Sequence, residues 1–460
     1  MQFSQGSVGH VSRPMRARSG TRFLGHVPQR WYRRTILPRS QLRSNPSTRH
    51  RIRARYGAAE RRLAEDRLSE AIGHATVSLY RSLTNNRKAL APMTIAPDSQ
   101  ALVEVVLVVL AASLLTAALI AALLPFLARH ALAKPNPRSS HVKSTPQGGG
   151  AAVIAATMIV ALVAAMSSPH LPRLEALQLA PLFAVVVFLS AVGAVDDISP
   201  LGVWPRLVLQ FAATIAMIAL LPRELRVLPD VPLWLERAIE ALFSLWFINV
   251  TNFMDGIDWM TVAEVLPVTV GLSVLGLLGA LPEHGLVLSL ALSGAIIGFA
   301  PFNRPVAKLF LGDVGSLPIG SLLAWLLIQL AAHGHLIAAL LLPLYYLADA
   351  TITLLRRVIN GERFWEAHRS HFYQRAMERG LSVPAIVGRV FAVNLFLVAL
   401  AVMTVLMPGV PSGSFSAVCG SVLITCLLVS FTPRRRCACG QLAISRRDET
   451  LLVVNRSAAL

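Results

Sequence analysis

From about residue 101 the sequence is a succession of apolar runs, each close to the ~20 residues that an α-helix needs to cross a bilayer. The runs are rich in Leu, Val and Ala and show little alternation of polar and apolar residues. Because a helix satisfies its own backbone hydrogen bonds in lipid, the pattern predicts an all-α fold, a polytopic integral membrane helical bundle of about 11 transmembrane helices. The runs lie at 103–127, 149–166, 178–195, 206–221, 236–253, 262–281, 286–302, 315–332, 336–355, 386–407 and 414–431.

The composition supports a membrane protein. Hydrophobic residues make up 54% of the 460 residues and charged residues only 15%, whereas soluble domains carry about 25% charged residues. The formal net charge of +19 is concentrated at the start of the chain, where residues 1–100 hold 19 Lys or Arg and five Asp or Glu. A compact soluble enzyme and a disordered polar chain are therefore both poor interpretations.

The distribution of charge and hydropathy divides the chain into three segments. Residues 1–92 form a basic extension that we expect to be disordered, and we hypothesise that Met93 is the real initiator. Residues 93–432 form the membrane domain, and 433–460 form a basic tail. The basic extension lacks the interleaved aromatic residues of nucleic-acid modules, so we expect no nucleic-acid partner.

The distribution of Lys and Arg between the loops predicts the orientation. One set of alternating loops, with the tail, holds 20 Lys or Arg, and the opposite set holds four. Positively charged loops remain in the cytoplasm, so the first set is predicted to be cytoplasmic. This set comprises residues 128–147, 196–206, 303–314, 356–389 and the tail from 433.

A cluster of acids lies on this predicted cytoplasmic side. The carboxylates and amide are Asp196, Asp197, Asn252, Asp255, Asp258 and Asp313. Carboxylate and amide oxygens suit Mg²⁺, a hard ion that shares substrate phosphates. Asp255 and Asp258 would share a face if their segment were helical. Asp196 and Asp197 are adjacent and cannot point the same way in a helix, so one would act as a base and the other as a ligand or orienting group.

Cationic groups lie in two further loops of the same side. Lys143 follows two prolines and precedes the glycines at 148–150. This pattern suits a phosphate, but taken alone it favours a positively charged cytoplasmic loop followed by a glycine-rich helix start. The segment that contains His368, Arg369 and His371 would place both histidines on one face if it were helical. This second segment is compatible equally with diphosphate binding and with an amphipathic helix on anionic lipid. Asp349 lies within a span and is predicted to be functional or to pair with Arg356.

The ordered motifs AVDD, NVTNFMDGID, FLGDVGS and AHRSHFYQR resemble those of the polyprenyl-phosphate N-acetylhexosamine-1-phosphate transferases. This family, glycosyltransferase family 4, includes the phospho-MurNAc-pentapeptide translocase and the initiators of O-antigen synthesis. The resemblance covers about residues 130 to 430. The His-Arg-Ser-His form is most similar to that of the O-antigen initiators, while Trp259-Met260 replaces the usual Gly-Leu.

The resemblance implies roles for individual residues. It implies a Mg²⁺ site, with Mn²⁺ as a substitute, at Asn252 and Asp313. It implies that Asp196 or Asp197 activates or positions the lipid phosphate, that Asp258 contacts the nucleotide-sugar and that Asp255 supports the same site. The substrate-binding residues that it implies are Lys143, Asp258, His368, Arg369 and His371.

The implied reaction is transfer of an N-acetylhexosamine 1-phosphate from a UDP-sugar to undecaprenyl phosphate. UMP would be released, and lipid-linked cell-envelope polysaccharide of the O-antigen or lipopolysaccharide type would be initiated. The implied location is the bacterial cytoplasmic membrane, with the active site facing the cytoplasm. Membrane lipid would surround the protein, and a dimer is one possible oligomeric state. The sugar stays open among N-acetylglucosamine, N-acetylfucosamine and N-acetylquinovosamine. The rival interpretation is a secondary transporter, whose acids usually lie near the membrane midplane instead.

Overall fold

The computed structural model describes residues 99–133, 144–167, 179–363 and 368–432. The predictions about residues 1–92, Met93 and the tail lie outside the described residues. The helices are α2 (Ser99–His130), α3 (Gly150–Ser167), α5 (Leu179–Ile198), α6 (Val203–Ala219), α7 (Leu233–Met254), α8 (Met260–Leu277), α9 (Glu283–Phe299), α10 (Asp313–Leu330), η4 (Ala331–His335), α11 (Leu336–Leu341), α12 (Leu344–Ile359), α13 (Phe372–Glu378), α14 (Val383–Leu406) and α15 (Val410–Phe431).

The predicted all-α fold is confirmed. Every predicted run coincides with helix, although the run at 336–355 is divided into α11 and α12. Within the described part of the chain, seven helices are long and apolar enough to cross a membrane, and α6 and α9 are shorter apolar helices. The count of 11 transmembrane helices stays a prediction.

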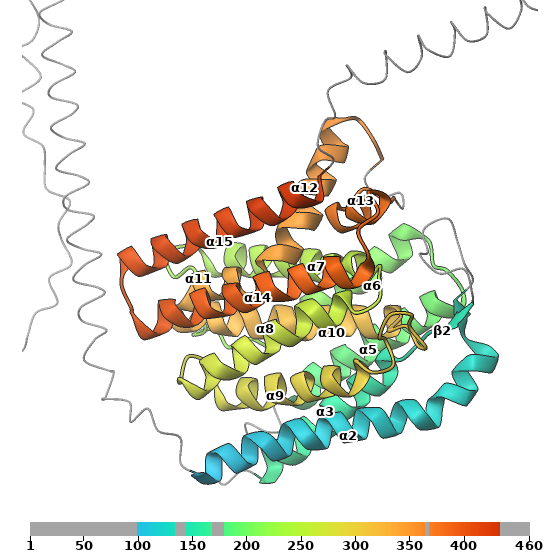
Figure 1. Ribbon diagram of the computed structural model, residues 1–460. Helices are drawn as coiled ribbons and strands as arrows, with labels where there is room; N and C mark the ends of the chain where they lie inside the picture. The colour runs from blue at the N-terminus through green and yellow to red at the C-terminus, as the bar shows by residue number, and fades with distance from the viewer. Residues whose placement is uncertain (1–98, 134–143, 168–178, 364–367, 433–460) are drawn as a thin grey trace, which may run out of the picture. The chain divides into compact units, whose positions relative to one another are not determined.

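Helix α10 lies at the centre of the bundle (Figure 1) and packs against α7, α5 and α3. All of its residues after Asp313 are buried. Helix α2, in contrast, lies at the periphery against α9 and α3, and apolar side chains such as Leu107 and Leu114 are more than half exposed. An apolar face that is exposed along a whole helix is typical of contact with lipid.

Two short strands connect α2 to the segment that precedes α10. Strand β1 (Leu132–Ala133) pairs antiparallel with β2 (Thr145–Pro146). The chain after β2 then runs beside residues 309–311, with the Gly149 amide donating to the Phe310 carbonyl at 2.9 Å and the Gly150 amide to the Leu311 carbonyl at 2.8 Å. These bonds place the glycines at 148–150 next to the start of α10.

Candidate active site at the ends of helices α5, α7 and α10

Asp197 binds the first backbone amides of α10. Its Oδ1 accepts from the Asp313 amide at 2.9 Å, and its Oδ2 accepts from the Val314 amide at 3.0 Å. A carboxylate stabilises a helix N-terminus because it satisfies free amides and opposes the positive end of the helix dipole. Gly312, at φ +77°, turns the chain into the helix, and a Cβ there would lie 2.5 Å from Asp197 Oδ2. Asp197 therefore fixes the position of Asp313.

Asp196 turns toward a different partner, as expected for adjacent residues of one helix. Its Oδ1 accepts from the Leu201 amide at 2.6 Å, and its Oδ2 accepts from Nη1 of Arg206 at 2.9 Å. The same Nη1 lies 3.6 Å from Asp313 Oδ2. One guanidinium nitrogen thus lies between two carboxylates from α5 and α10.

Asn252, in the last turn of α7, completes this cluster. Its Nδ2 donates to Asp313 Oδ1 at 2.7 Å and to the Ser316 hydroxyl at 2.9 Å. The cluster of Asp196, Arg206, Asn252 and Asp313 is called the acidic cluster below. The structure therefore brings together four side chains from four helices at one end of the bundle.

The acidic cluster contains oxygen donors of the kind that Mg²⁺ takes. In the described ranges, no group of three or more His, Cys, Asp or Glu side chains is arranged to hold an ion by itself. Mg²⁺ does not require such a group, because it is usually held by one or two carboxylates together with water and substrate phosphates. Asp196 and Asp313 both lie close to the cationic group of Arg206. Together these two carboxylates carry enough negative charge to bind a further cation.

Asp255 and Asp258 lie in the loop between α7 and α8, so the helical segment that would give them a shared face is not formed. Helix α7 ends at Met254, and Asp258 sits in a turn before α8. Asp255 accepts a hydrogen bond from the Thr261 hydroxyl, and Asp258 Oδ2 accepts from the Ala307 amide at 3.0 Å. Burial raises the pKa of Asp255 to about 6, with the negative charges of Asp197 and Asp258 adding to the effect.

Trp259, the first residue of the Trp259-Met260 pair, has a left-handed backbone at φ 62°. Such a conformation is uncommon for a residue with a Cβ and costs it energy that glycine does not pay. Two hydrogen bonds hold Trp259 in place, from its amide to Asn303 Oδ1 and from its indole to the Ala300 carbonyl, both at 2.7 Å. The tryptophan thus ties the loop of Asp258 to the loop that follows α9.

Asp349 holds the start of α13. It is fully buried, and its Oδ1 accepts from the Phe372 amide at 3.1 Å and lies 3.2 Å from His371 Nδ1. The hydroxyls of Tyr345 and Thr353 also donate to it, at 3.2 and 3.3 Å. Of the two alternatives for Asp349, the pairing with Arg356 is not the one observed: Asp349 pairs with His371 at 3.2 Å, and the Arg356 guanidinium lies 5.6 Å from the centroid of the Phe372 ring.

Residues 368–371 are not helical, so the condition under which His368 and His371 would share a helical face is not met either. The rings of His368 and His371 nevertheless lie 4.9 Å apart, centroid to centroid. Arg369 is exposed and lines a cavity of about 220 Å³ together with Gly256, Ile257 and Gln374. The predicted histidine pair is therefore next to the Asp255–Asp258 loop. Lys143 lies outside the described residues.

Arg206 is the residue of this site that the sequence reasoning missed. It was counted only as a basic residue of a loop, although its sequence context, an arginine just inside an apolar helix, was a usable signal.

Gly193 allows α5 to approach α10 closely. A Cβ at Gly193 would lie 2.2 Å from the Asp313 carbonyl oxygen, whereas a Cβ at Gly388 of α14 would have no atom within 4 Å. We expect Gly193→Ala to lower the free energy of unfolding by about 1–3 kcal/mol, seen as a lower midpoint of thermal unfolding in detergent. The control Gly388→Ala should leave this midpoint unchanged or raise it. Equal midpoints for the two variants would contradict the close packing.

The sequence of this chain is similar to those of several known proteins. The family model described as Glycosyl transferase family 4 matches residues 179–331. The chain is 26% identical, over 57% of its length and 76% of the relative, to a probable undecaprenyl-phosphate N-acetylglucosaminyl 1-phosphate transferase of Bacillus subtilis (strain 168). It is 27% identical, over 51% of its length and 75% of the relative, to a phospho-N-acetylmuramoyl-pentapeptide-transferase of Leuconostoc mesenteroides. A decaprenyl-phosphate N-acetylglucosaminephosphotransferase of Mycolicibacterium smegmatis is 27% identical over 55% of this chain and 70% of the relative.

Proposed function

This chain belongs to glycosyl transferase family 4, and from that premise we propose that it transfers an N-acetylhexosamine 1-phosphate from a UDP-sugar to undecaprenyl phosphate. The names of these relatives describe sugar-1-phosphate transfer to a polyprenyl phosphate. The matched residues 179–331 include the whole acidic cluster. The chain is thus a multi-pass membrane transferase, and the donor, the acceptor and the ion are the proposal.

The observation that carries the proposal is the acidic cluster. Asp196 and Asp313 come from different helices and meet at one nitrogen of Arg206, at 2.9 and 3.6 Å. Charged groups in a membrane protein are costly away from water, so their gathering at one end of the bundle suits a reaction between ionic substrates. An acceptor with a lipid tail would reach this end with its phosphate.

The proposed step is attack by a phosphate oxygen of undecaprenyl phosphate on the β-phosphorus of the UDP-sugar. A new P–O bond forms as the bond to the UMP oxygen breaks, and UMP leaves. Both reactants are anionic, so the protein must offset their repulsion and align them. Arg206 and Arg369 supply positive charge, as do the histidines His368 and His371 when protonated.

The residues divide into those that contact substrate and those that position others. The Asp196 side chain binds Arg206, and we assign Asp196 to the lipid phosphate. Asp197 binds the first amides of α10, and we assign it to positioning Asp313. Asn252 and Asp313 would hold Mg²⁺, which neutralises diphosphate charge when bound. Asp258 would contact the nucleotide-sugar, and Asp255 would support its loop.

The finer identity rests on sequence motifs and on the names of the relatives. The His-Arg-Ser-His motif favours initiation of cell-envelope polysaccharide of the O-antigen type, and the Bacillus and Mycolicibacterium names favour N-acetylglucosamine as the first sugar to test. We propose that the acidic cluster faces the cytoplasm from a bacterial inner membrane, and the excess of Lys and Arg in one set of loops supports this orientation.

The purified protein tests the proposal directly. We would incubate it with undecaprenyl phosphate and, in parallel, UDP-linked N-acetylglucosamine, N-acetylfucosamine and N-acetylquinovosamine. The expected result is UMP release with one donor and a lipid product whose mass has increased by one N-acetylhexosamine 1-phosphate. Absence of UMP and of this product with every donor would refute the transferase, and donor-independent substrate flux in proteoliposomes would favour a transporter.

Removal of divalent ions should stop the reaction. We expect EDTA to reduce UMP release to background, and an excess of Mg²⁺ to restore it, with Mn²⁺ as a partial substitute. The reason is that two anionic substrates need a cation between them, an effect worth several kcal/mol. The measurement is the initial rate against free Mg²⁺, with equal ionic strength in Na⁺ as the control. Full activity in EDTA would contradict the metal site.

A further inference from the structure

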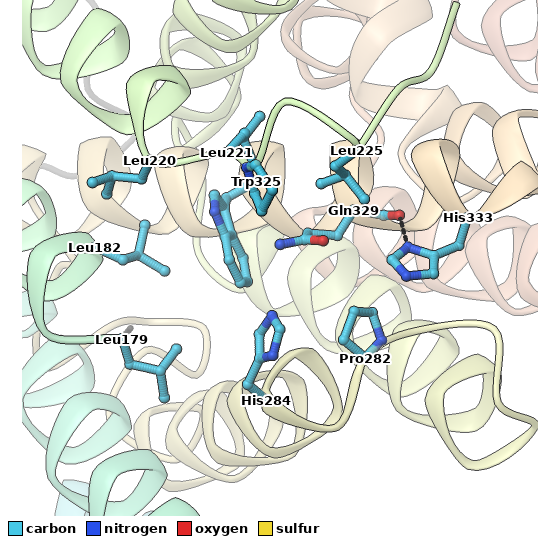
Figure 2. Close-up of a pocket in the computed structure, with 11 residues that line it drawn as sticks. Leu179, Leu182, Leu220, Leu221, Leu225, Pro282, His284, Trp325, Gln329 and His333 are labelled. Atoms are coloured by element: carbon cyan, nitrogen blue, oxygen red, sulfur yellow. Dashed lines mark hydrogen bonds between the residues drawn. The ribbon is translucent and has the colours of Figure 1, made fainter. Parts of the chain in front are cut away.

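A second pocket lies at the end of α10 opposite to the acidic cluster, and Figure 2 shows the side chains that line it. It is formed by the ends of α5, α6, α9 and α10 and has a volume of about 230 Å³. One water needs only about 10–15 Å³ of such space. Gln329, which lines the pocket, is about 24 Å along α10 from Asp313 at 1.5 Å per residue. The pocket is therefore separate from the proposed reaction.

Gln329 is buried, and its side-chain amide has no hydrogen-bond partner among the described residues. The residue is only 5% exposed, and no described residue makes a hydrogen bond with its amide group. Figure 2 shows this amide extending into the pocket, between Trp325 and His333. A polar amide in a mostly buried residue gains stability from a hydrogen bond. The Gln329 amide can therefore bind a ligand group that both accepts and donates hydrogen bonds.

Two imidazoles add defined hydrogen-bonding groups. His333 Nδ1 lies 2.7 Å from the backbone carbonyl oxygen of Gln329. Because a carbonyl oxygen only accepts, this nitrogen carries the hydrogen, and Nε2 of the neutral ring is left as an acceptor. His284, whose ring centroid is 5.4 Å from that of Trp325, has a buried Nδ1 without a hydrogen-bond partner among the described residues.

The remaining wall of the pocket is apolar. Leucines of α5 and of the α6 end, including Leu182 and Leu221, line it together with Pro282. Among the described residues, no Lys, Arg, Asp or Glu lines the pocket. A phosphate or an ammonium group would lose its hydration there without a countercharge, which is strongly unfavourable. The lining therefore selects an uncharged polar group that is attached to an apolar chain.

We propose that this pocket binds the head of an uncharged, hydroxyl-bearing lipid of the monoacylglycerol kind. The hydroxyls bond to the Gln329 amide and to the two imidazoles, and the chain lies along the leucines of α5 and α6. This assignment does not depend on the transferase proposal, because it uses residues from the other end of the bundle.

Quenching of Trp325 fluorescence measures the binding. The probe is 9,10-dibromostearoyl glycerol, whose bromines quench a nearby indole, added to the full-length protein in detergent. Because the chain has seven tryptophans, the signal is assigned by the variant Trp325→Phe. We expect saturable quenching in the unmodified protein and none of that component in Trp325→Phe. Quenching that never saturates would overturn the proposal.

Competition identifies the head group. Unlabelled 1-oleoylglycerol should displace the probe, and two molecules with the same chain should be at least about tenfold weaker. These are methyl oleate, which has no hydroxyl, and 1-oleoylglycerol 3-phosphate, which carries a charge. Equal displacement by methyl oleate would show that only the chain is bound, and equal displacement by the phosphate would show a site for anions. Either result overturns the proposal.

Two independent substitutions test the polar groups. Gln329→Met keeps the length of the side chain, and His284→Phe keeps a ring next to Trp325. Each should raise the half-saturating probe concentration, by about tenfold for Gln329→Met. The control His130→Phe removes an exposed histidine of α2 and should leave the half-saturating probe concentration unchanged. If Gln329→Met does not fold, His284→Phe decides, and unchanged affinity in it contradicts the assignment.

Discussion

We expect Asp313→Asn to lower the rate of UMP release by about a thousandfold, or about 4 kcal/mol in transition-state stabilisation. The substitution removes one negative charge from the place where Asn252 and Arg206 converge, at 2.7 and 3.6 Å from the Asp313 carboxylate. The asparagine retains the shape of the side chain and an acceptor for Asn252. The loss therefore reports charge and metal binding, because packing is preserved.

The measurement combines turnover with folding. UMP release is followed at several Mg²⁺ concentrations, and the midpoint of thermal unfolding is measured in the same detergent. The control Asp230→Asn removes an exposed acid from the loop before α7 and should leave both quantities unchanged. Turnover of Asp313→Asn within about threefold of the unmodified protein, at ordinary Mg²⁺, would exclude Asp313 as a metal ligand.

Asp349→Ala is expected to detach α13 and to remove most activity. The buried carboxylate accepts from two backbone amides at the start of α13 and from two hydroxyls, and it contacts His371. Removing it leaves several donors buried without a partner, at about 1–3 kcal/mol for each. We expect the free energy of unfolding to fall by about 3–5 kcal/mol. Without this anchor, Arg369 and His371 would no longer be held in position.

Hydrogen exchange locates this effect. Amides of Phe372–Glu378 should exchange much faster in Asp349→Ala, while those of α10 keep their protection. Asp349→Asn, which keeps an acceptor but introduces an amide donor, should show an intermediate effect. The control Glu362→Gln removes an exposed carboxylate that pairs with Arg357 at 2.8 Å and should cost less than about 1 kcal/mol. Unchanged exchange in α13 would show that Asp349 does not hold it.

Some of the candidate site was predictable because it depends on local sequence. Asp196, Asn252 and Asp313 each lie at the end of an apolar run, and charged residues at helix ends meet water at little cost. Helices that alternate in direction bring such ends to the same side. The sequence therefore indicated a cluster of acids, without saying which atoms face each other.

Other parts depended on contacts between distant residues. Asp197 caps a helix 116 residues away, and this contact separates its role from that of Asp196, which the sequence left open. The three-residue spacing of Asp255 and Asp258 would give a shared face only on a helix, but α7 ends at Met254. A Cβ at Gly256 would lie 2.0 Å from the Tyr373 hydroxyl, so the backbone of this loop and α13 pack together closely.

The sequence by itself determined that the chain is a helical membrane protein, because hydropathy and run length are local properties, and its ordered motifs indicated the family. The tertiary structure alone decided that Arg206 lies between two acids, that Asp349 holds His371, and that an uncharged pocket exists at the other end of α10. These features depend on the packing of α5, α6, α7, α10 and α12, in which close approach at small residues such as Gly193 sets which side chains meet. Hydropathy carries no information about those side-chain directions.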